Sequence, residues 1–271
     1  MMDKNIEQEM HLKENLSRIK HKIMVMSGKG GVGKSTVAVN LAYGLLLHGK
    51  TVGIMDVDIH GPSLAKMIGF EGVGVTANEN GRIAPITKHE NLHAISIAAF
   101  LKSEDDPIIW RGPMKITLIK QFMSDVEWPE LDYLIVDCPP GTGDEPLSVV
   151  QTLGNDTNAV IVTTQQDVAY LDVRKSIRFC KDVNMPILGL VENMVAVKCP
   201  HCGEYFTLFE GQNSEKANAD FGVDLLGKID FDKNITESSD NGEPFIYHNS
   251  LTEAGKQIQA VVDNIMKAVE K

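Results

Sequence analysis

Residues 28–36 have the types and the spacing of a loop that binds phosphate. Gly28 is followed after four residues by Gly33, Lys34 and Ser35, in the order Gly-x4-Gly-Lys-Ser. Glycines carry no Cβ atom, so successive backbone N–H groups can turn toward one phosphate and adopt positive φ angles where needed. Lys34 then supplies a mobile cation for the outer phosphates, and Ser35 supplies a hydroxyl ligand for Mg²⁺.

The sequence on either side of this loop provides the context that the pattern requires. Ile23–Met26 is a β-branched and methionine-rich run typical of a strand, and Thr36–His48 is rich in good helix formers. The helix would aim the partial positive charge of its N-terminus at the bound anion. A glycine-rich turn that binds nothing is the alternative, and the intact spacing and flanks argue against it.

Two carboxylates follow the next predicted strand, Thr51–Met55. In a doubly wound sheet, Asp56 and Asp58 would lie beside the phosphate loop, at the carboxyl ends of the strands where ligands bind. We assign Asp58 to positioning the water that attacks the γ-phosphate. We assign Asp56 to an indirect contact with Mg²⁺. A pair of turn residues at a strand end is the plainer interpretation.

A third carboxylate ends an apolar strand in the middle of the chain. Tyr133–Val136 is apolar and Asp137 follows it, which is the Walker B pattern that organises Mg²⁺ beside a phosphate loop. Residues 139–141, Pro-Pro-Gly, predict a switch segment whose backbone moves when the γ-phosphate leaves. We interpret Cys138, between these two features, as a small buried residue.

The remaining pattern predicts an α/β fold with a doubly wound, mostly parallel sheet flanked by helices. Ala159–Thr163 and Ile187–Val191 are apolar strands in this alternation. The second of them delivers Asn193 to the same sheet edge, where its amide is suitably placed to hydrogen-bond a purine. We expect residues 1–20 to be a polar lead, helical or disordered, and residues 21–271 to be a single phosphate-loop domain.

Cys199 and Cys202 form a C-x-x-C pair, which is half of a metal site. Two thiolates on one tight turn can hold one ion, but a tetrahedral site needs four ligands, and the chain has no second C-x-x-C pair. Three completions are open: further ligands such as His201 from the same chain, a dithiol redox pair, or two cysteines from a second subunit across a two-fold axis. Four thiolates around such an axis suit a [4Fe–4S] cluster as well as zinc.

The composition limits the classes of partner. The 271 residues are 43% hydrophobic and 23% charged, which is ordinary for a globular chain. A net charge of −11 argues against non-specific binding to nucleic acid or to anionic membrane surfaces. No apolar run reaches the ~20 residues of a membrane span, and four cysteines without disulfide spacing indicate a reducing, cytoplasmic location.

Six motifs in this order resemble those of the Mrp/ApbC-type iron–sulfur cluster carrier ATPases. They are KGGVGKST, DVDIHGPS, WRGPM, DCPPGTGD, VENM and CPHCG, and the resemblance runs from about His21 to about Gly255. The first motif is shared with the wider deviant phosphate-loop class, which includes MinD, ParA and the nitrogenase iron protein. DVDIHGPS, WRGPM and CPHCG are typical of the carrier branch.

The resemblance implies roles for the residues of a site for ATP and Mg²⁺. Lys29 matches a lysine that reaches across a homodimer interface to the nucleotide of the other subunit. Asp58 would serve the hydrolytic water, Asp137 the metal and Asn193 the adenine. The loop contacts to the nucleotide would come from Gly28, Gly30, Gly31, Val32, Gly33, Lys34, Ser35 and Thr36.

The resemblance also implies a cargo. Cys199 and Cys202 would share one [4Fe–4S] cluster with the same pair of a second subunit, and the homodimer would transfer that cluster to apoproteins while hydrolysing ATP slowly. Some members carry a cysteine-rich N-terminal extension that has no counterpart here, so we expect no second stable cluster per subunit.

Two rival functions follow from the wider class. A MinD/ParA-like positioning ATPase would use the C-x-x-C pair as a structural zinc site in a dimer, and iron or zinc content separates it from a carrier. A reductase resembling the nitrogenase iron protein would keep a permanent cluster, but that relative takes its cluster cysteines from two separate segments.

Overall fold

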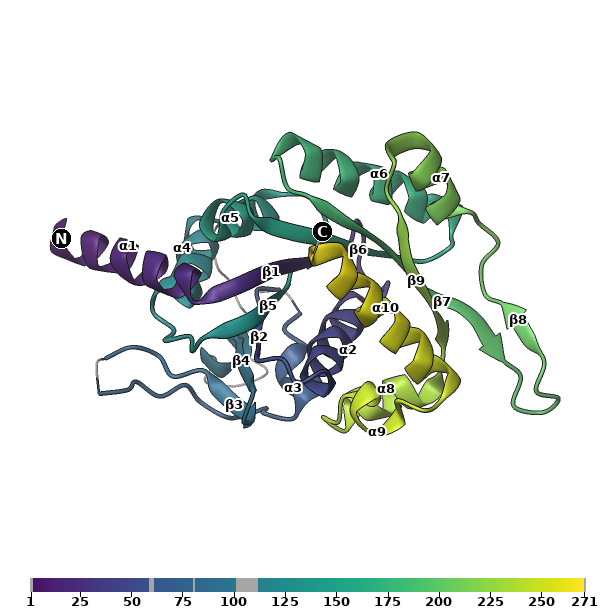
Figure 1. The fold of residues 1–271 in the computed structure, drawn as a ribbon, viewed down its shortest axis with the longest axis horizontal. Coiled ribbons are helices and arrows are strands. Elements are labelled where there is room, and N and C mark those ends of the chain that lie inside the picture. The colour runs from purple at the N-terminus through teal and green to yellow at the C-terminus, as the bar shows by residue number, and fades with distance from the viewer. Residues whose placement is uncertain (1, 59–60, 80, 101–111, 271) are drawn as a thin grey trace.

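The computed structural model describes residues 2–58, 61–79, 81–100 and 112–270 (Figure 1). The strands are β1 (Ile19–Met26), β2 (Val52–Asp56), β3 (Ile86–His89), β4 (Leu92–Ser96), β5 (Leu131–Asp137), β6 (Thr157–Thr163), β7 (Ile187–Lys198), β8 (Tyr205–Thr207) and β9 (Leu225–Phe231). The helices are α1 (Met2–Ser17), α2 (Lys34–Leu47), α3 (Leu64–Ile68), α4 (Gly112–Ser124), α5 (Asp144–Leu153), α6 (Asp167–Asp182), α7 (Asn213–Phe221), α8 (Lys233–Asp240), α9 (Phe245–Asn249) and α10 (Glu253–Val269). The motif residues Ile59, His60, Trp110 and Arg111 lie outside the described residues.

The strands form one sheet in the order β3-β4-β2-β5-β1-β6-β7-β8, with β9 also paired to β7. All neighbours from β4 to β7, and the pair β7–β9, run parallel, whereas β3 and β8 pair antiparallel. The predicted fold class, an α/β fold with a mostly parallel sheet flanked by helices, is confirmed. Because β1 lies between β5 and β6, the loop after β1 opens at the centre of the sheet, at the strand ends where ligands bind.

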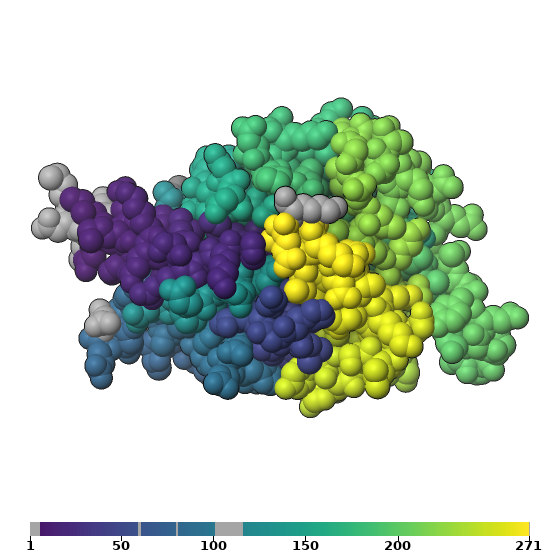
Figure 2. Space-filling view, viewed as in Figure 1, coloured from purple at the N-terminus to yellow at the C-terminus, as the bar shows by residue number. Residues whose placement is uncertain are grey.

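The two faces of the sheet bury two separate apolar layers. Ile23 and Val25 of β1 face the layer that contains α2 and α10, whereas Met24 and Met26 face the layer of α4, α5 and α6. This division follows from the alternation of side chains along a strand. α10 lies beside α2, in yellow and dark blue in Figure 2.

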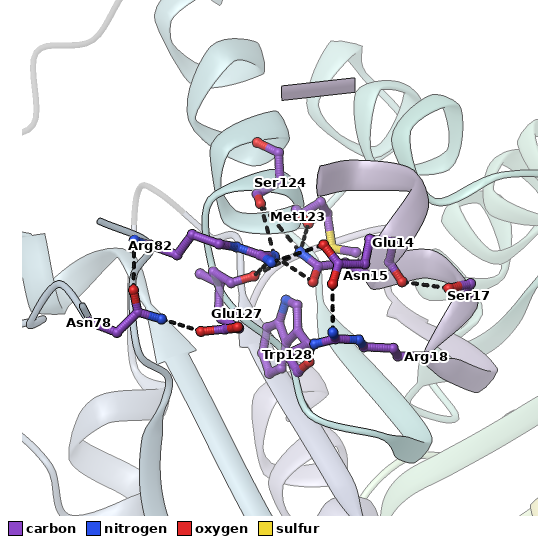
Figure 3. Close-up of polar contacts among 11 residues, drawn as sticks. Glu14, Asn15, Ser17, Arg18, Asn78, Arg82, Met123, Ser124, Glu127 and Trp128 are labelled. Atoms are coloured by element: carbon purple, nitrogen blue, oxygen red, sulfur yellow. Dashed lines mark hydrogen bonds and ion pairs between the residues drawn. The ribbon is translucent and has the colours of Figure 1, made fainter. Parts of the chain in front are cut away.

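The N-terminal lead is a helix, α1, whose last turn is anchored to the protein body (Figure 3). Asn15 is fully buried, and its Nδ2 donates to the carbonyl oxygens of Met123 at 2.6 Å and Val126 at 2.7 Å. Nη2 of Arg82 donates to Asn15 Oδ1 at 2.8 Å. These bonds satisfy buried polar atoms and connect α1 to α4 and to the segment before β5.

One local expectation differs from the structure. β7 does not end before Asn193 but continues to Lys198, with a shift in its pairing to β9 between Asn193 and Val197. On the other side of the sheet, β4 ends at Ser96 and continues as a 3-10 turn.

No helix within the described ranges combines the length and the apolar character that crossing a membrane requires.

Candidate functional site

The loop between β1 and α2 has the backbone geometry of an anion cradle. Gly31 and Gly33 have φ angles of 77° and 83°, which glycine adopts without steric cost. Gly33 is the capping residue of α2 and has no side chain that could occupy the N–H groups of the first helical turn. These groups and the helix dipole favour a phosphate at this position.

Lys34, the first residue of α2, has three polar side chains close to its ammonium group. Its Nζ is 2.5 Å from Asp137 Oδ1, 3.9 Å from Asp58 Oδ2 and 3.3 Å from Ser35 Oγ. Burial alone would lower the pKa of Lys34, but the carboxylates of Asp137 and Asp58 outweigh it, so the pKa is raised and the ammonium group is charged. The positive charge therefore sits where the predicted Mg²⁺ ligands converge.

Asp137 has the features of a metal-organising carboxylate at the end of β5. Its side chain is fully buried, and while Oδ1 accepts from Lys34, Oδ2 has no hydrogen-bond partner among the described residues. A buried carboxylate oxygen without a donor is costly unless a ligand completes it. Together with the Ser35 hydroxyl, Asp137 offers the hard oxygen ligands that Mg²⁺ prefers, so these residues fit the ion.

Asp56 is a third buried carboxylate, next to Asp58 and Asp137 at this edge of the sheet. It pairs in register with Asp137 across β2 and β5 and accepts from Asp58 N at 3.0 Å, Leu64 N at 3.3 Å and Ser96 Oγ at 3.1 Å. Complete burial, with the nearby Asp137 charge, raises the pKa of Asp56 to about 8. Asp56 thus ties the turn after β2 to the start of α3 and holds Asp58 toward Lys34.

Lys29 contacts the start of α6 within the same chain. Its Nζ donates to Oε1 of Gln166, the residue that precedes α6. A Cβ atom on Gly28 would lie 2.4 Å from Asp172 Cβ, so the loop packs directly against this helix. Gln166 was not predicted, because nothing in its local pattern places it beside a loop so far away in the sequence.

Asn193 braces the phosphate loop from β7. Its Nδ2 donates to the carbonyl oxygen of Val32 at 3.0 Å, and a Cβ atom on Gly33 would lie 2.1 Å from that nitrogen. Asn193 is therefore at the expected sheet edge, but its amide is engaged by the loop. Its contact with adenine stays a prediction.

The loop borders a cavity of about 400 Å³. One wall is the loop with Lys34, Asp58 and Asn193, and the other comes from α3, the end of β9 and α8. Asp232 shapes this second wall, because its side chain caps α8 by accepting from the backbone N–H of Asn234 at 2.9 Å. The lining of this cavity therefore joins the phosphate loop to α8.

Cys199 and Cys202 lie on the turn between β7 and β8. Backbone bonds close this turn, from Cys199 N to Glu204 O at 2.8 Å and from Gly203 N to Cys199 O at 2.9 Å. Backbone N–H groups of Cys202 and His201 point at the Cys199 sulfur and lower the pKa of its thiol. Cys202 is exposed, so the turn presents a thiolate-stabilising pair at the surface.

The pair is incomplete within the part of the chain that the structure describes. No group of three or more His, Cys, Asp or Glu side chains gathers there in a geometry that holds a metal ion. Cys138 and Cys180 are buried in the apolar layer of α4, α5 and α6, as expected for Cys138. A tetrahedral centre at Cys199 and Cys202 therefore requires ligands from elsewhere.

Comparison with known proteins identifies the family. The family model described as ParA, NUBPL iron-transfer P-loop NTPase, matches residues 18–266. The chain belongs to this family. A relative in Methanocaldococcus jannaschii, named iron–sulfur cluster carrier protein, is 45% identical over 264 residues, covering 97% of this chain and 90% of the relative. A protein of the same name in Saccharolobus solfataricus is 44% identical over 262 residues, which cover 97% of this chain and 88% of that protein.

Solved structures support the same assignment. A nucleotide-binding protein of Archaeoglobus fulgidus, in complex with ADP, superposes with a TM-score of 0.75 at 36% identity, covering 86% of this chain and 90% of that protein. MinD of Pyrococcus furiosus has a TM-score of 0.68 at 24% identity and shares the fold. The expected kinship with phosphate-loop NTPases of the MinD/ParA class is confirmed.

Within this NUBPL-family chain, sequence reasoning missed part of the second wall of the cavity. Lys66 and Met67 of α3, and Ser239 and Asp240 of α8, line it. These residues form no motif, and the packing of α3 against α8 brings them together. The polar residues between 230 and 240 were the available signal, because they follow the last parallel strand at the ligand-binding edge.

Proposed function

We propose that this protein is an ATP-binding and ATP-hydrolysing carrier that holds a [4Fe–4S] cluster between the subunits of a homodimer and transfers it to apo iron–sulfur proteins. The observation that carries the proposal is the position of the Cys199–Cys202 turn. This incomplete thiol pair, with Cys199 half-buried and Cys202 exposed, directly follows β7, the strand that contacts the phosphate loop. The names of the archaeal relatives support the same cargo.

The nucleotide half of the proposal assigns each side chain of the loop region a task. Backbone N–H groups of the loop bind the phosphates, and Lys34 exchanges Asp137 for them when the nucleotide enters. Ser35 and Asp137 would hold Mg²⁺, which supplies charge neutralisation for the β- and γ-phosphates. Asp58 orients the attacking water, and Asp56 keeps Asp58 in place through the backbone N–H of Asp58.

The dimer half of the proposal explains two otherwise unrelated features. Lys29 leaves Gln166 and reaches the nucleotide of the other subunit, where its charge stabilises the developing phosphate charge. Two subunits related by a two-fold axis place two copies of the Cys199–Cys202 pair opposite each other, giving four thiolates. Delivery is then thiolate exchange: cysteines of the acceptor replace Cys199 and Cys202 on iron, and no redox step is required.

The test is anaerobic reconstitution with iron and sulfide, followed by metal analysis and measurement of the mass in solution. Wild type should hold about four irons and four sulfides per dimer. Cys199→Ser should abolish cluster binding yet leave ATP affinity unchanged, whereas Cys180→Ser, which alters a buried cysteine, should retain the cluster. Unchanged iron and sulfide in Cys199→Ser contradicts the proposal.

The same preparation tests the MinD/ParA-like alternative. The Cys199–Cys202 turn, with backbone N–H groups directed at sulfur, suits zinc as well as iron. The positioning ATPase with a structural zinc site is supported if the anaerobically purified dimer contains zinc, does not bind iron on reconstitution and transfers no cluster to an apo-acceptor.

A further inference from the structure

β7 physically connects the phosphate loop to the cysteine turn. Asn193, within this strand, bonds the loop through the Val32 carbonyl, and the strand ends at Lys198, directly before Cys199 (Figure 1). Five residues of chain therefore separate the loop contact from the turn. A displacement of Asn193 has a short covalent path to the thiols.

The residue next to Asn193 is conformationally strained. Met194 has a φ of 57°, in the left-handed region, and among the described non-glycine residues it shares a positive φ with Asn184 alone. The pairing of β7 with β9 shifts register between Asn193 and Val197, so the ladder is interrupted at this position. The left-handed conformation disfavours a methionine by about five- to thirtyfold in population, so surrounding contacts must maintain it.

The phosphate loop provides those contacts. The Asn193–Val32 hydrogen bond fixes the preceding residue, and the Met194 side chain comes within 3.5 Å of the position of a Cβ atom on Gly33. Beyond the interruption, Val197 pairs with Phe231, and Phe231 borders both the nucleotide cavity and a second cavity of about 560 Å³ that is lined by Cys199. Segments on both sides of the strained residue thus adjoin a functional site.

We propose that Asn193 and Met194 form a latch that couples nucleotide binding at the loop to the accessibility of Cys199 and Cys202 in the same subunit. Without nucleotide, the bond to Val32 holds Met194 in its strained conformation and the cysteine turn in place. Nucleotide binding draws the Asn193 amide away from Val32, Met194 relaxes, and residues 195–199 move with it. The latch rests on the proposed function, because it assigns the nucleotide site a regulatory effect on the cargo site.

The test measures alkylation of each cysteine by iodoacetamide in cluster-free, full-length protein, with peptide mass spectrometry as the readout. ADP at saturating concentration is the probe, because it fills the loop but lacks the γ-phosphate that is hydrolysed in the proposed dimer. Cys180 is buried outside the nucleotide site and serves as the internal reference. In wild type, ADP should raise the alkylation rate of Cys199 by about fivefold. This is the lower end of the population ratio given above for a methionine in the left-handed conformation.

Two variants should respond in opposite ways. Asn193→Ala removes the bond to Val32, so Cys199 should react at the ADP-bound rate without any nucleotide. Met194→Gly adopts the positive φ without strain, so the free-state conformation persists and the ADP effect should fall below about twofold. Asn184→Gly is the matched control, because it relieves the same kind of strain at an exposed position before β7. It should behave as wild type.

A full ADP response in Met194→Gly, or an unchanged nucleotide-free rate in Asn193→Ala, overturns the latch. So does a wild type whose thiols ignore ADP. Iron and sulfide content of wild type is measured in parallel and tests the proposed function separately. A protein that binds the cluster but shows no effect of ADP on its thiols contradicts the latch alone.

Discussion

The ammonium group of Lys34 lies 2.5 Å from Oδ1 of Asp137, and both side chains are withdrawn from solvent. The lysine provides the positive charge that neutralises Asp137. In the function proposed above, Lys34 leaves Asp137 when Mg²⁺ and a nucleotide bind, so the pair stabilises the free protein and is lost on binding. Two predictions follow from this arrangement of buried charges.

Asp137→Asn should destabilise the nucleotide-free protein and remove the dependence of nucleotide affinity on Mg²⁺. A buried ammonium group that loses its partner costs about 3 kcal/mol or more of unfolding free energy. Asp132→Asn is the control, because Asp132 forms a pair of similar length, 2.6 Å, with the exposed Lys20 and should cost less than about 1 kcal/mol. Urea unfolding and calorimetric titration of ATP with and without Mg²⁺ measure both effects. Equal destabilisation by the two variants would contradict the buried-pair interpretation.

The pKa of Asp56 predicts a dependence of stability on pH in metal- and nucleotide-free protein. Folding raises the pKa of this carboxyl from 3.8 to about 8, so the native state binds a proton that the unfolded state releases. The resulting stabilisation is complete below pH 3.8 and is lost as the pH rises through about 8. Asp56→Asn mimics the protonated form and should flatten this part of the profile. Parallel unfolding profiles for wild type and Asp56→Asn between pH 5 and 9 would refute the shift.

Gly33→Ala should be more harmful than alanine at another glycine with positive φ. At Gly33 the new Cβ atom meets both an unfavourable φ of 83° and the Asn193 amide at 2.1 Å. At Gly222, where φ is 70°, no atom lies within 4 Å of the position of an added Cβ atom. Gly222→Ala should therefore lose only the conformational term, about 1–2 kcal/mol. The free energy of unfolding of Gly33→Ala should be clearly lower than that of Gly222→Ala. Similar values would show that Asn193 does not pack against the loop.

Asn15→Ala should loosen the N-terminal helix. The change removes the Asn15 donor from the buried Met123 carbonyl oxygen, while Val126 O keeps a bond from Arg82 Nη2 at 3.2 Å and Arg82 keeps its pair with Glu14. Leaving the Met123 carbonyl without a donor costs about 1–3 kcal/mol. Ser17→Ala is the control on the same helix, because its hydroxyl bonds an exposed carbonyl one turn earlier. Hydrogen exchange of residues 6–17, with urea unfolding, reports the loss. Unchanged exchange in Asn15→Ala would mean that the polar network of Figure 3 does not hold α1.

Local motifs predicted the parts of the site that adjacent residues build. The phosphate loop is contiguous, and Asp58 and Asp137 follow apolar strands whose carboxyl ends must share one edge of a parallel sheet. Their convergence on Lys34 required the fold class and nothing more. The cysteine turn was likewise visible, because C-x-x-C is a local spacing.

Contacts between distant segments were not predictable from the sequence. Asn193 and Val32 are 161 residues apart, and the hydrogen bond between them depends on how β7 passes the loop. An asparagine after an apolar strand suggests a ligand contact, whereas the continuation of β7 through a strained Met194 leaves no periodic signal. The pairing of Lys29 with Gln166 is hidden for the same reason.

A mixed dimer tests most directly whether one cluster needs cysteines from two subunits. One subunit is wild type, the other carries Cys199→Ser and Cys202→Ser, and different affinity tags isolate the heterodimer before anaerobic reconstitution. We predict iron and sulfide near background in this heterodimer, and a full cluster in a control heterodimer with Cys180→Ser in one subunit. Retention of about half the wild-type iron, with intact cluster absorbance, would show that each chain completes its own site and would contradict a bridging cluster.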